Sequence, residues 1–255
     1  MRVFLIDGNA VAYRAYYSYA TRGLTNSQGF PTNAVYGFAL CLRKILKDES
    51  PDAIAVAFDV KGPTFRHEMY KEYKAHRKPT PDDLIVQFPK VKEMVEAWNI
   101  PIFEQSGYEA DDILGTMSAK LAADGHDVVI VTSDKDACQL VNDRIRIMDP
   151  GKDYVMIDAE GVRSKMGVTP EQVCDLLALI GDASDNIPGA PGIGPKTAVG
   201  LIDQYGDLES IHQNIGSMKA KSKQKALSEN WDKVLLSKKL ATIVLDAPMQ
   251  IDVES

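Results

Sequence analysis

The chain has 255 residues, of which 45% are hydrophobic and 25% are charged, a composition typical of globular proteins. It contains no apolar run of the ~20 residues that a membrane helix needs, and it does not begin with the pattern of a signal peptide. Its three cysteines, Cys41, Cys138 and Cys174, are too far apart to suggest a disulfide framework or a thiolate zinc site. These features exclude a membrane protein and predict a soluble, cytoplasmic one.

The formal charge of −7 arises from 36 acidic and 29 basic residues. Nine of the acids fall into tight clusters that are typical of metal binding. Without these nine, 27 acids stand against 29 bases. The net charge therefore does not exclude a nucleic acid as a partner.

Strand and helix signals alternate over the first 160 or so residues. Residues 3–6, 53–58 and 128–131 are short apolar runs, which are typical of parallel strands buried on both faces. Residues 34–46 and 113–123 show helical patterns, with Thr32 as an N-cap and Gly125 as a C-terminal stop. This alternation predicts an α/β fold with a mostly parallel central sheet and helices on both faces.

Only helix signals follow residue 168. A helix is expected over 169–180, then a segment rich in Gly and Pro, then further helices that end near residue 245. We therefore expect an α/β domain over 1–168 and an all-helical module over 169–255.

Acidic residues follow the predicted strands and also begin one predicted helix. Any single cluster has an ordinary explanation as a turn, a cap or a partner of a helix dipole. The nine acids are Asp7, Asp59, Glu109, Asp111, Asp112, Asp134, Asp136, Asp182 and Asp185.

Taken together, these acids predict a metal centre. The carboxyl ends of parallel strands share one edge of a sheet, where carboxylates would repel one another unless a cation neutralised them. Oxygen ligands without His or Cys favour Mg²⁺ or Mn²⁺, and so many carboxylates are consistent with a two-metal site. Such sites hydrolyse phosphodiesters, so we expect this reaction.

Residues 66–78 alternate cations with tyrosines. On a helix, one stripe would contain Arg66, Tyr70, Tyr73 and Arg77, beside a second stripe of lysines. Cations interleaved with aromatic rings suit a nucleic-acid strand, which needs charge for its phosphates and flat surfaces for its bases. A solvated surface helix with partly buried tyrosines is the alternative from this pattern alone.

A glycine-rich hairpin at 188–198 leads into a predicted helix at Pro195. Backbone amides at such a helix start can hold a phosphate, and Lys196 and Thr197 add polar groups there. The alternative is a simple Gly-Pro turn.

Six segments of this chain resemble the 5′ nuclease (flap endonuclease) superfamily, and within it the 5′–3′ exonuclease domains at the N-terminus of bacterial DNA polymerases of type I. They cover essentially the whole chain and occur in the same order as in that family. The segments are FLIDGN, AVAFD, FRHEMYKEYKAHR, YEADD, TSDKD and GDASDNIPGAPGIGPKTA.

The resemblance implies roles for individual residues. It makes the nine acids the metal ligands, and it makes residues 66–83 a helical arch over the active site. Lys74 and Arg77 would steer phosphates there, with Tyr73 nearby, and Tyr13 would stack on the substrate. It also implies a helix–three-turn–helix element at about 175–205 that grips duplex DNA. The residues matching its DNA-contacting turn are Gly192, Ile193, Gly194, Pro195, Lys196 and Thr197.

Relatives hold a potassium ion in this element through backbone carbonyls. The matching positions here are Leu179, Ile180, Pro188, Ala190 and Ile193. The chain ends close to where polymerase relatives continue into further domains, so a standalone nuclease and a polymerase fragment both remain open.

We expect a monomeric, nucleoid-associated 5′–3′ exonuclease or flap endonuclease. Its substrate would be branched or nicked duplex DNA with a 5′ single strand. Two alternatives remain open. One is a metal-dependent ribonuclease of the PIN type, although such domains usually lack both the arch and the hairpin module. The other is a non-catalytic module that binds branched DNA.

Overall fold

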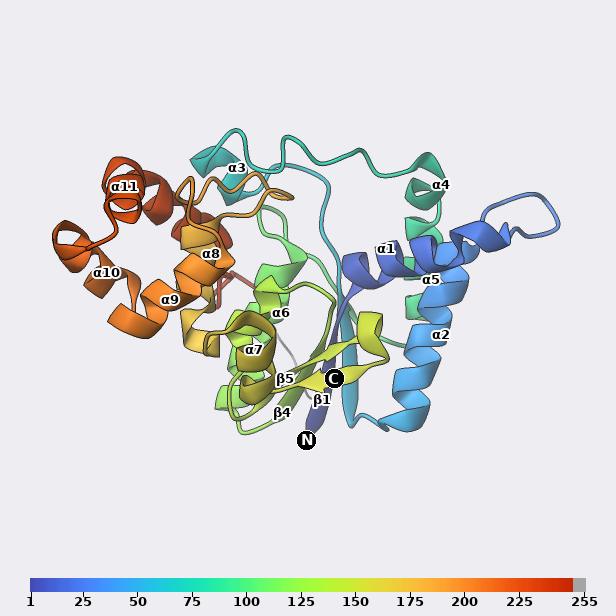
Figure 1. The fold of residues 1–255 in the computed structure, drawn as a ribbon. Helices are drawn as coiled ribbons and strands as arrows, with labels where there is room; N and C mark the ends of the chain where they lie inside the picture. Colours follow the sequence, from blue (N-terminus) through green and yellow to red (C-terminus); the bar gives the residue numbers. More distant parts are fainter. Residues whose placement is uncertain (250–255) are drawn as a thin grey trace. The chain divides into compact units, whose positions relative to one another are not determined.

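The computed structural model describes residues 1–249, which form two compact units (Figure 1). The first unit comprises residues 1–64, residues 78–158 and the described residues from Val244 onward. The second comprises Phe65–Arg77 and Ala159–Ile243. The division differs from a single boundary at residue 168, because Phe65–Arg77 groups with the helical unit, that unit begins at Ala159, and the chain returns to the first unit at Val244.

A six-stranded sheet forms the centre of the first unit. Its order is β3-β2-β1-β4-β5-β6, and all neighbouring pairs are parallel except β5 with β6. The strands are β1 (Arg2–Asp7), β2 (Ala53–Ala57), β3 (Ile102–Phe103), β4 (Asp127–Val131), β5 (Ile145–Asp149) and β6 (Val155–Ile157). The helices are α1 (Gly8–Tyr19), α2 (Asn33–Asp48), α4 (Asp82–Ile85), α5 (Phe88–Ala97) and α6 (Ala110–Ala123), with short 3₁₀ helices η1 (Ala20–Arg22), η2 (Asp136–Leu140) and η3 (Pro150–Lys152).

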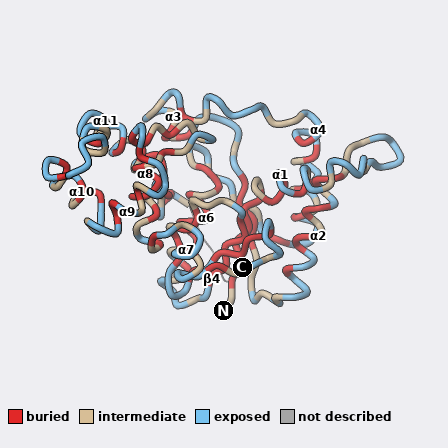
Figure 2. Tube along the Cα trace, viewed as in Figure 1, coloured by how far each residue is buried: buried red, intermediate tan, exposed pale blue. Residues whose placement is uncertain are grey.

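Helices cover both faces of this sheet, as the sequence predicts. Phe4 and Ile6 of β1 belong to a hydrophobic core that includes residues of α1, α2 and α5, while α6 packs against the sheet from the other side (Figure 1). The inner strands are buried almost throughout (Figure 2). The three predicted strands and the two predicted helices of this unit are confirmed as β1, β2, β4, α2 and α6.

The second unit is entirely helical. Its elements are α3 (Phe65–Met69), α7 (Ala159–Met166), η4 (Pro170–Gln172), α8 (Val173–Ile180), α9 (Pro195–Tyr205), α10 (Leu208–Asn214), η5 (Ile215–Ser217) and α11 (Lys221–Ala241). A loop with two close-packed glycines joins α8 to α9. A Cβ at Gly181 would lie 2.4 Å from the Ile187 carbonyl oxygen, and one at Gly189 would lie 2.4 Å from the Gly181 nitrogen. Both glycines have positive φ, so no other residue fits this crossing without strain.

The predicted arch helix is wrong over most of its length. Within 66–83, only the part of α3 up to Met69 and the first two residues of α4 are helical, and turns follow α3 up to residue 76. Lys74 adopts a left-handed φ of 57°, and its N–H donates to the Asp185 carbonyl at 2.9 Å. A contact within the second unit thus replaces the hydrogen bond that would have continued the helix.

Two further observations concern helix lengths. The last helix ends at Ala241, four residues before the predicted end. Among residues 1–249, no helix has the length and apolar character needed to cross a membrane.

Candidate active site

Three strand-end acids lie along one edge of the sheet. Asp7 is the last residue of β1, Asp59 follows β2 by two residues, and Asp134 follows β4 by three. Because β2, β1 and β4 are adjacent and parallel, their carboxyl ends place these acids side by side. The three acids therefore lie at the carboxyl edge of the sheet, as the sequence predicts.

Asp7 is buried and tightly held. Its Oδ1 accepts a hydrogen bond from Ala10 N at 2.8 Å and so caps α1, while its Oδ2 accepts one from Thr132 Oγ1 at 2.8 Å. Burial raises the pKa of Asp7 to about 6, although both hydrogen bonds oppose the rise. The charges of Asp59 and Asp134 make a smaller contribution to this rise. Asp7 therefore carries a proton more readily than an ordinary carboxylate.

Two uncharged side chains hold these acids in place. The buried Thr132 hydroxyl donates to Asp7 and accepts from Asp134 N at 3.0 Å, so it links the ends of β1 and β4. Asn9 Oδ1 accepts from Asp59 N at 2.9 Å. The sequence analysis missed both residues. The sequence does show both as polar residues close to a strand-end acid, Asn9 in the segment IDGN and Thr132 in the segment VTSD.

Helix α6 brings two more acids toward the same edge. Asp59 Oδ1 accepts from Ala110 N at 2.7 Å, which ties the end of β2 to the start of α6. Burial raises the pKa of Asp111 well above its usual value, and the charges of Asp134, Asp7, Asp59 and Glu109 add to the rise. These five acids therefore form one electrostatically coupled group, named the edge cluster below.

Asp112, another predicted metal ligand, is held by hydrogen bonds to the backbone. It is fully buried, and its Oδ2 accepts from Glu109 N at 3.0 Å in a capping box at the start of α6. Its Oδ1 accepts from Val244 N at 2.9 Å. Because both oxygens bind backbone amides inside the protein, Asp112 is better placed to position α6 than to bind a metal. The sequence could not separate it from its neighbour Asp111.

Asp136 lies beside the edge cluster in sequence and begins η2. Its N–H donates to Asp134 Oδ1 at 2.9 Å, and its Oδ1 lies 3.5 Å from Lys135 Nζ. It remains a predicted ligand.

The donor set of the edge cluster fits a hard divalent cation. It consists of carboxylate oxygens without His or Cys, which is the set that Mg²⁺ and Mn²⁺ prefer. As the side chains of residues 1–249 stand, no three His, Cys, Asp or Glu residues converge closely enough to hold an ion directly. Mg²⁺ usually keeps several bound waters, and these can connect the ion to carboxylates that are too far away to bind it directly. Burial and neighbouring negative charges raise the pKa of Asp7 and Asp111, so a nearby positive charge would be favourable.

The remaining two predicted ligands belong to the second unit. Asp185 binds cations of its own unit: Arg77 donates to its Oδ1 from Nε at 2.9 Å and also from Nη2, and Lys74 Nζ lies 3.9 Å from its Oδ2. The Tyr73 hydroxyl donates to the same Oδ2 at 3.3 Å. Asp182 Oδ1 accepts from Ser184 N at 2.7 Å. Their part in metal binding remains a prediction.

Arg66 and Tyr73 are both buried in this conformation, and their contact with DNA remains a prediction. Arg66 is 2% exposed, and its guanidinium donates to the carbonyls of Leu240 and Thr242 at 2.9 Å each. Tyr73 is 3% exposed. Arg66 thus anchors α3 to the end of α11, because the carbonyls at a helix C-terminus need donors.

Tyr13 is partly buried within the first unit. Its hydroxyl forms a hydrogen bond with the Thr80 hydroxyl, and its ring packs edge-on against Phe88 at 6.1 Å between centroids. Stacking of Tyr13 on a substrate remains a prediction.

The glycine hairpin leads into α9 at Pro195, as predicted. Gly192 has φ of 86°, and Thr197 N and Ala198 N donate to the Gly194 carbonyl. In the predicted potassium ring, the carbonyls of Leu179 and Ala190 accept from Ala190 N and Ile193 N. DNA and potassium binding here remain predictions.

Two family models match the chain. The N-terminal resolvase-like domain of 5′-3′ exonucleases matches residues 2–167, and the C-terminal SAM fold of 5′-3′ exonucleases matches residues 168–255.

Curated relatives match nearly the whole chain. DNA polymerase I of Bacillus caldotenax is 44% identical over 256 residues, which cover 99% of this chain and 29% of the polymerase. DNA polymerase I of Bacillus subtilis strain 168 is 43% identical over 255 residues, which cover 99% of this chain and 29% of the polymerase. The chain therefore spans less than a third of the length of these relatives.

Solved structures confirm the fold. The 5′-exonuclease of T5 with bound divalent zinc ions aligns at a TM-score of 0.79 with 21% identity, covering 94% of this chain and 89% of that one. The D15 flap endonuclease of bacteriophage T5, as a complex with DNA and metal ions, aligns at 0.75 with 22% identity over the same shares.

Proposed function

Because the chain belongs to the 5′–3′ exonuclease family, we propose that it is a structure-selective, divalent-metal-dependent nuclease. It hydrolyses phosphodiesters near the junction of 5′-flapped or nicked duplex DNA. The observation that carries this proposal is the edge cluster, five acids at the carboxyl edge of a parallel sheet, among which the pKa of Asp7 and of Asp111 is raised by burial and by the neighbouring charges. Repulsion among these acids destabilises the folded protein, and bound cations would relieve it, which favours a functional role in metal binding.

The carboxylates of the edge cluster would hold the ions. When bound, divalent ions supply an activated water and stabilise the leaving oxygen of an in-line displacement. Asp7 and Asp111 bind best in their charged forms, and the pKa of each is raised, so protons compete with metal at both residues. At Asp7, whose pKa is about 6, this competition falls near pH 6. Thr132 and Asn9 fix the acids through hydrogen bonds, which reduces the reorganisation needed on binding.

The second unit would supply contacts to the DNA backbone. Lys74 and Arg77 present donors suited to phosphate oxygens, and both are held here by Asp185. The start of α9, with Lys196 and Thr197, offers backbone amides to a duplex phosphate. Contacts to phosphates rather than bases make binding indifferent to sequence.

Finer details belong to the same proposal. We propose two or more Mg²⁺ or Mn²⁺ ions and a potassium ion in the loop between α8 and α9. We also propose that the nuclease acts on DNA as a monomer. Carboxylates of the edge cluster outnumber the needs of one hydrated Mg²⁺, which supports more than one ion.

Cleavage of a 5′-labelled flap duplex tests the proposal. We expect Mg²⁺ to release a short 5′ fragment near the junction, whereas EDTA and Ca²⁺ prevent its release. Asp134→Asn should nearly abolish cleavage while DNA binding in Ca²⁺ persists. The matched control is Asp124→Asn, an exposed acid just after the opposite end of α6.

Other outcomes would contradict the proposal in distinct ways. Cleavage of a matched RNA hairpin but not of DNA would indicate a ribonuclease. Binding of the flap in Ca²⁺ without cleavage in Mg²⁺ or Mn²⁺ would indicate a non-catalytic module. Full activity of Asp134→Asn would remove this residue from the metal site.

A further inference from the structure

A further acid lies at the end of β5, next to the edge cluster. Asp149 is the last residue of that strand, which runs parallel to β4 and pairs with it. Because the carboxyl ends of parallel strands share one edge of a sheet, Asp149 lies at the same edge as the edge cluster. It is not among the nine predicted ligands. Its side chain is 4% exposed, and a buried carboxylate needs hydrogen-bond donors.

One oxygen of Asp149 accepts two hydrogen bonds. Asp149 Oδ1 accepts from Ser133 Oγ at 3.0 Å and from Gly151 N at 2.8 Å, and the second bond caps η3. Thr132 N also donates to the Met148 carbonyl at 3.2 Å, so the strand ends are paired up to the residue before Ser133. Asp149 therefore extends the connection between β4 and β5 into the segment that follows β4.

The backbone at Gly151 packs directly against this hydrogen bond. A Cβ at Gly151 would lie 2.8 Å from Asp149 Oδ1 and 3.1 Å from Ser133 Oγ. Any residue other than glycine would have to displace one of these two oxygens. The turn after β5 thus closely encloses the Ser133–Asp149 pair.

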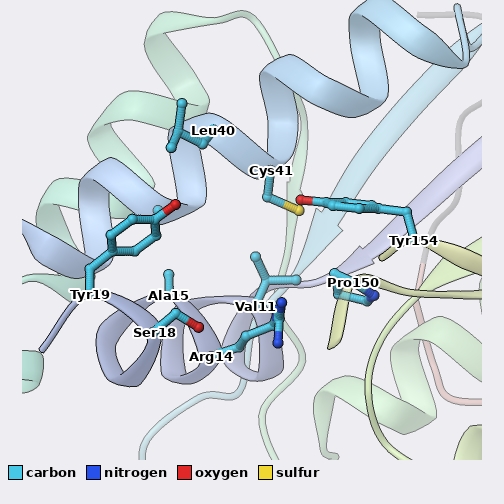
Figure 3. Close-up of a pocket in the computed structure, with 10 residues that line it drawn as sticks. Val11, Arg14, Ala15, Ser18, Tyr19, Leu40, Cys41, Pro150 and Tyr154 are labelled. Carbon is cyan, nitrogen blue, oxygen red and sulfur yellow. The ribbon is translucent and has the colours of Figure 1, made fainter. Parts of the chain in front are cut away.

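The far end of the same turn is fixed on α2. Asp153 and Tyr154 have φ of 53° and 60°, in the left-handed region that side chains disfavour. Such a backbone persists only where surrounding contacts hold it. Tyr154 lines a cavity of about 90 Å³ between this turn, α1 and α2, where its hydroxyl points at the Cys41 sulfur (Figure 3). Lys44 Nζ lies 5.0 Å from the centroid of the Tyr154 ring. The turn is therefore a fixed support for Asp149.

Two residues that precede Asp134 are held from opposite sides of β4. Thr132 Oγ1 donates to Asp7 of β1 at 2.8 Å and accepts from Asp134 N at 3.0 Å. Ser133 donates to Asp149 of β5, and β1 and β5 flank β4 in the sheet. Freedom that the segment has already lost in the folded protein need not be lost on cation binding, so these bonds favour a ligand at Asp134.

We propose that Asp149 is a positioning residue, which acts through Ser133 to hold Asp134 in place for a cation at the edge cluster. This inference rests on the proposed function for the role of Asp134. Asp149 serves here as a hydrogen-bond acceptor, so an amide oxygen can replace its carboxylate. A direct metal ligand would instead need the negative charge.

Calorimetric titration of the DNA-free protein with Mn²⁺ tests the proposal. Ser133→Ala and Asp149→Ala should each lower the affinity by about tenfold, the lower end of the range for a group that orients a ligand. Ser133→Thr keeps the hydroxyl and Asp149→Asn keeps the acceptor, so both should retain most of the affinity. The double alanine variant should lose no more than Asp149→Ala, because both changes break the same bond.

The matched control is Asn142→Ala, at the opposite end of β5. Asn142 Oδ1 also accepts two backbone hydrogen bonds, from Arg144 N at 2.9 Å and Ile145 N at 3.0 Å. This control should keep the wild-type affinity for Mn²⁺. A loss equal to that of Asp149→Ala would assign the effect to general loosening of the turns of β5 and would overturn the proposal.

Amide hydrogen exchange in EDTA tests the positioning without any metal. Ser133→Ala should speed exchange of the Asp134 N–H by roughly fivefold, as expected when one supporting hydrogen bond is lost. Unchanged exchange would overturn the proposal, and so would an Asp149→Asn variant that binds Mn²⁺ as weakly as Asp149→Ala. Cleavage of the flap duplex by the wild type in Mg²⁺ reports separately: binding of Mn²⁺ without cleavage would contradict the proposed function alone.

Discussion

The two units support buried carboxylates in opposite ways. In the edge cluster of the first unit, Asp7 and Asp111 are desolvated among other acids, and the pKa of each is raised. In the second unit, Asp185 is also mostly shielded, but Arg77, Lys74 and Tyr73 surround it with donors. The first arrangement needs an external cation, whereas the second supplies its own. The difference identifies the sheet edge as the place where metal binding would stabilise the protein.

Removal of one edge acid should have the largest effect. Asp111→Asn takes away a carboxylate that four other acids surround, so cleavage should fall by more than about a hundredfold, the upper range for losing a supporting contact. Single-turnover cleavage of a flap duplex in Mg²⁺ measures this fall in the cleavage rate. The Asp124→Asn control should retain the wild-type rate, and a similar loss in that control would contradict a specific role.

The metal-free protein should gain stability when Asp7 loses its charge. The pKa of Asp7 is about 6 when folded and near 3.8 when unfolded, so its protonated form favours folding. This stability is present below pH 3.8 and is lost as pH rises through 6. Asp7→Asn should therefore raise the free energy of unfolding in EDTA at pH 7.5, by up to about 3 kcal/mol.

Urea denaturation at pH 5 and pH 7.5 measures this change. The gain from Asp7→Asn should be smaller at pH 5, where the wild-type carboxyl is already largely protonated. A loss of stability at both pH values would mean that the two hydrogen bonds of Asp7 outweigh its burial.

Thr132 offers a sharper test of how the edge cluster is held. Thr132→Val removes the hydroxyl that joins Asp7 to Asp134 but keeps the shape of the side chain. Metal affinity should fall by about ten- to a hundredfold, as expected for a group that orients ligands. Calorimetric titration with Mn²⁺ measures the change. Thr132→Ser should restore most of the affinity, and failure of this rescue would indicate general disruption of the site.

The smallest effect is expected in the second unit. Asp185→Asn breaks the pairing with Arg77 and Lys74, yet Arg77 is half-exposed and solvent screens the pair. Stability in EDTA should fall by only about 1 kcal/mol. Urea denaturation would compare Asp185→Asn with a control substitution, Asp203→Asn, at an exposed acid on α9. A gain comparable to that of Asp7→Asn would show that the two clusters do not differ as described.

Sequence reasoning succeeded where the direction of the backbone alone decides where a residue lies. Apolar runs that end in Asp7 and Asp59 predict parallel strands, and parallel strands bring their carboxyl ends to one edge. The start of α9 at Pro195 was predictable for a similar local reason, since proline suits the first turn of a helix. These features depend on short segments and on general rules of sheet topology.

Sequence reasoning failed where contacts with distant parts of the chain override a local pattern. The stripe containing Arg66 and Tyr73 assumes a helix, but the Asp185 carbonyl captures the N–H of Lys74 and the chain turns. Asp112 looks identical to Asp111 in sequence, and only the return of the chain at Val244 separates their roles. Neither partner lies near in sequence, so no local pattern could reveal it.

Proton release on metal binding tests the central claim most directly. Mn²⁺ would be titrated into the DNA-free protein at pH 6 in two buffers of different ionisation enthalpy. Because Asp7 is half-protonated near this pH and Asp111 also has a raised pKa, binding should release at least about half a proton per protein, and less at pH 8. Binding with no dependence on the buffer, or no binding at all, would contradict a metal site at the edge cluster.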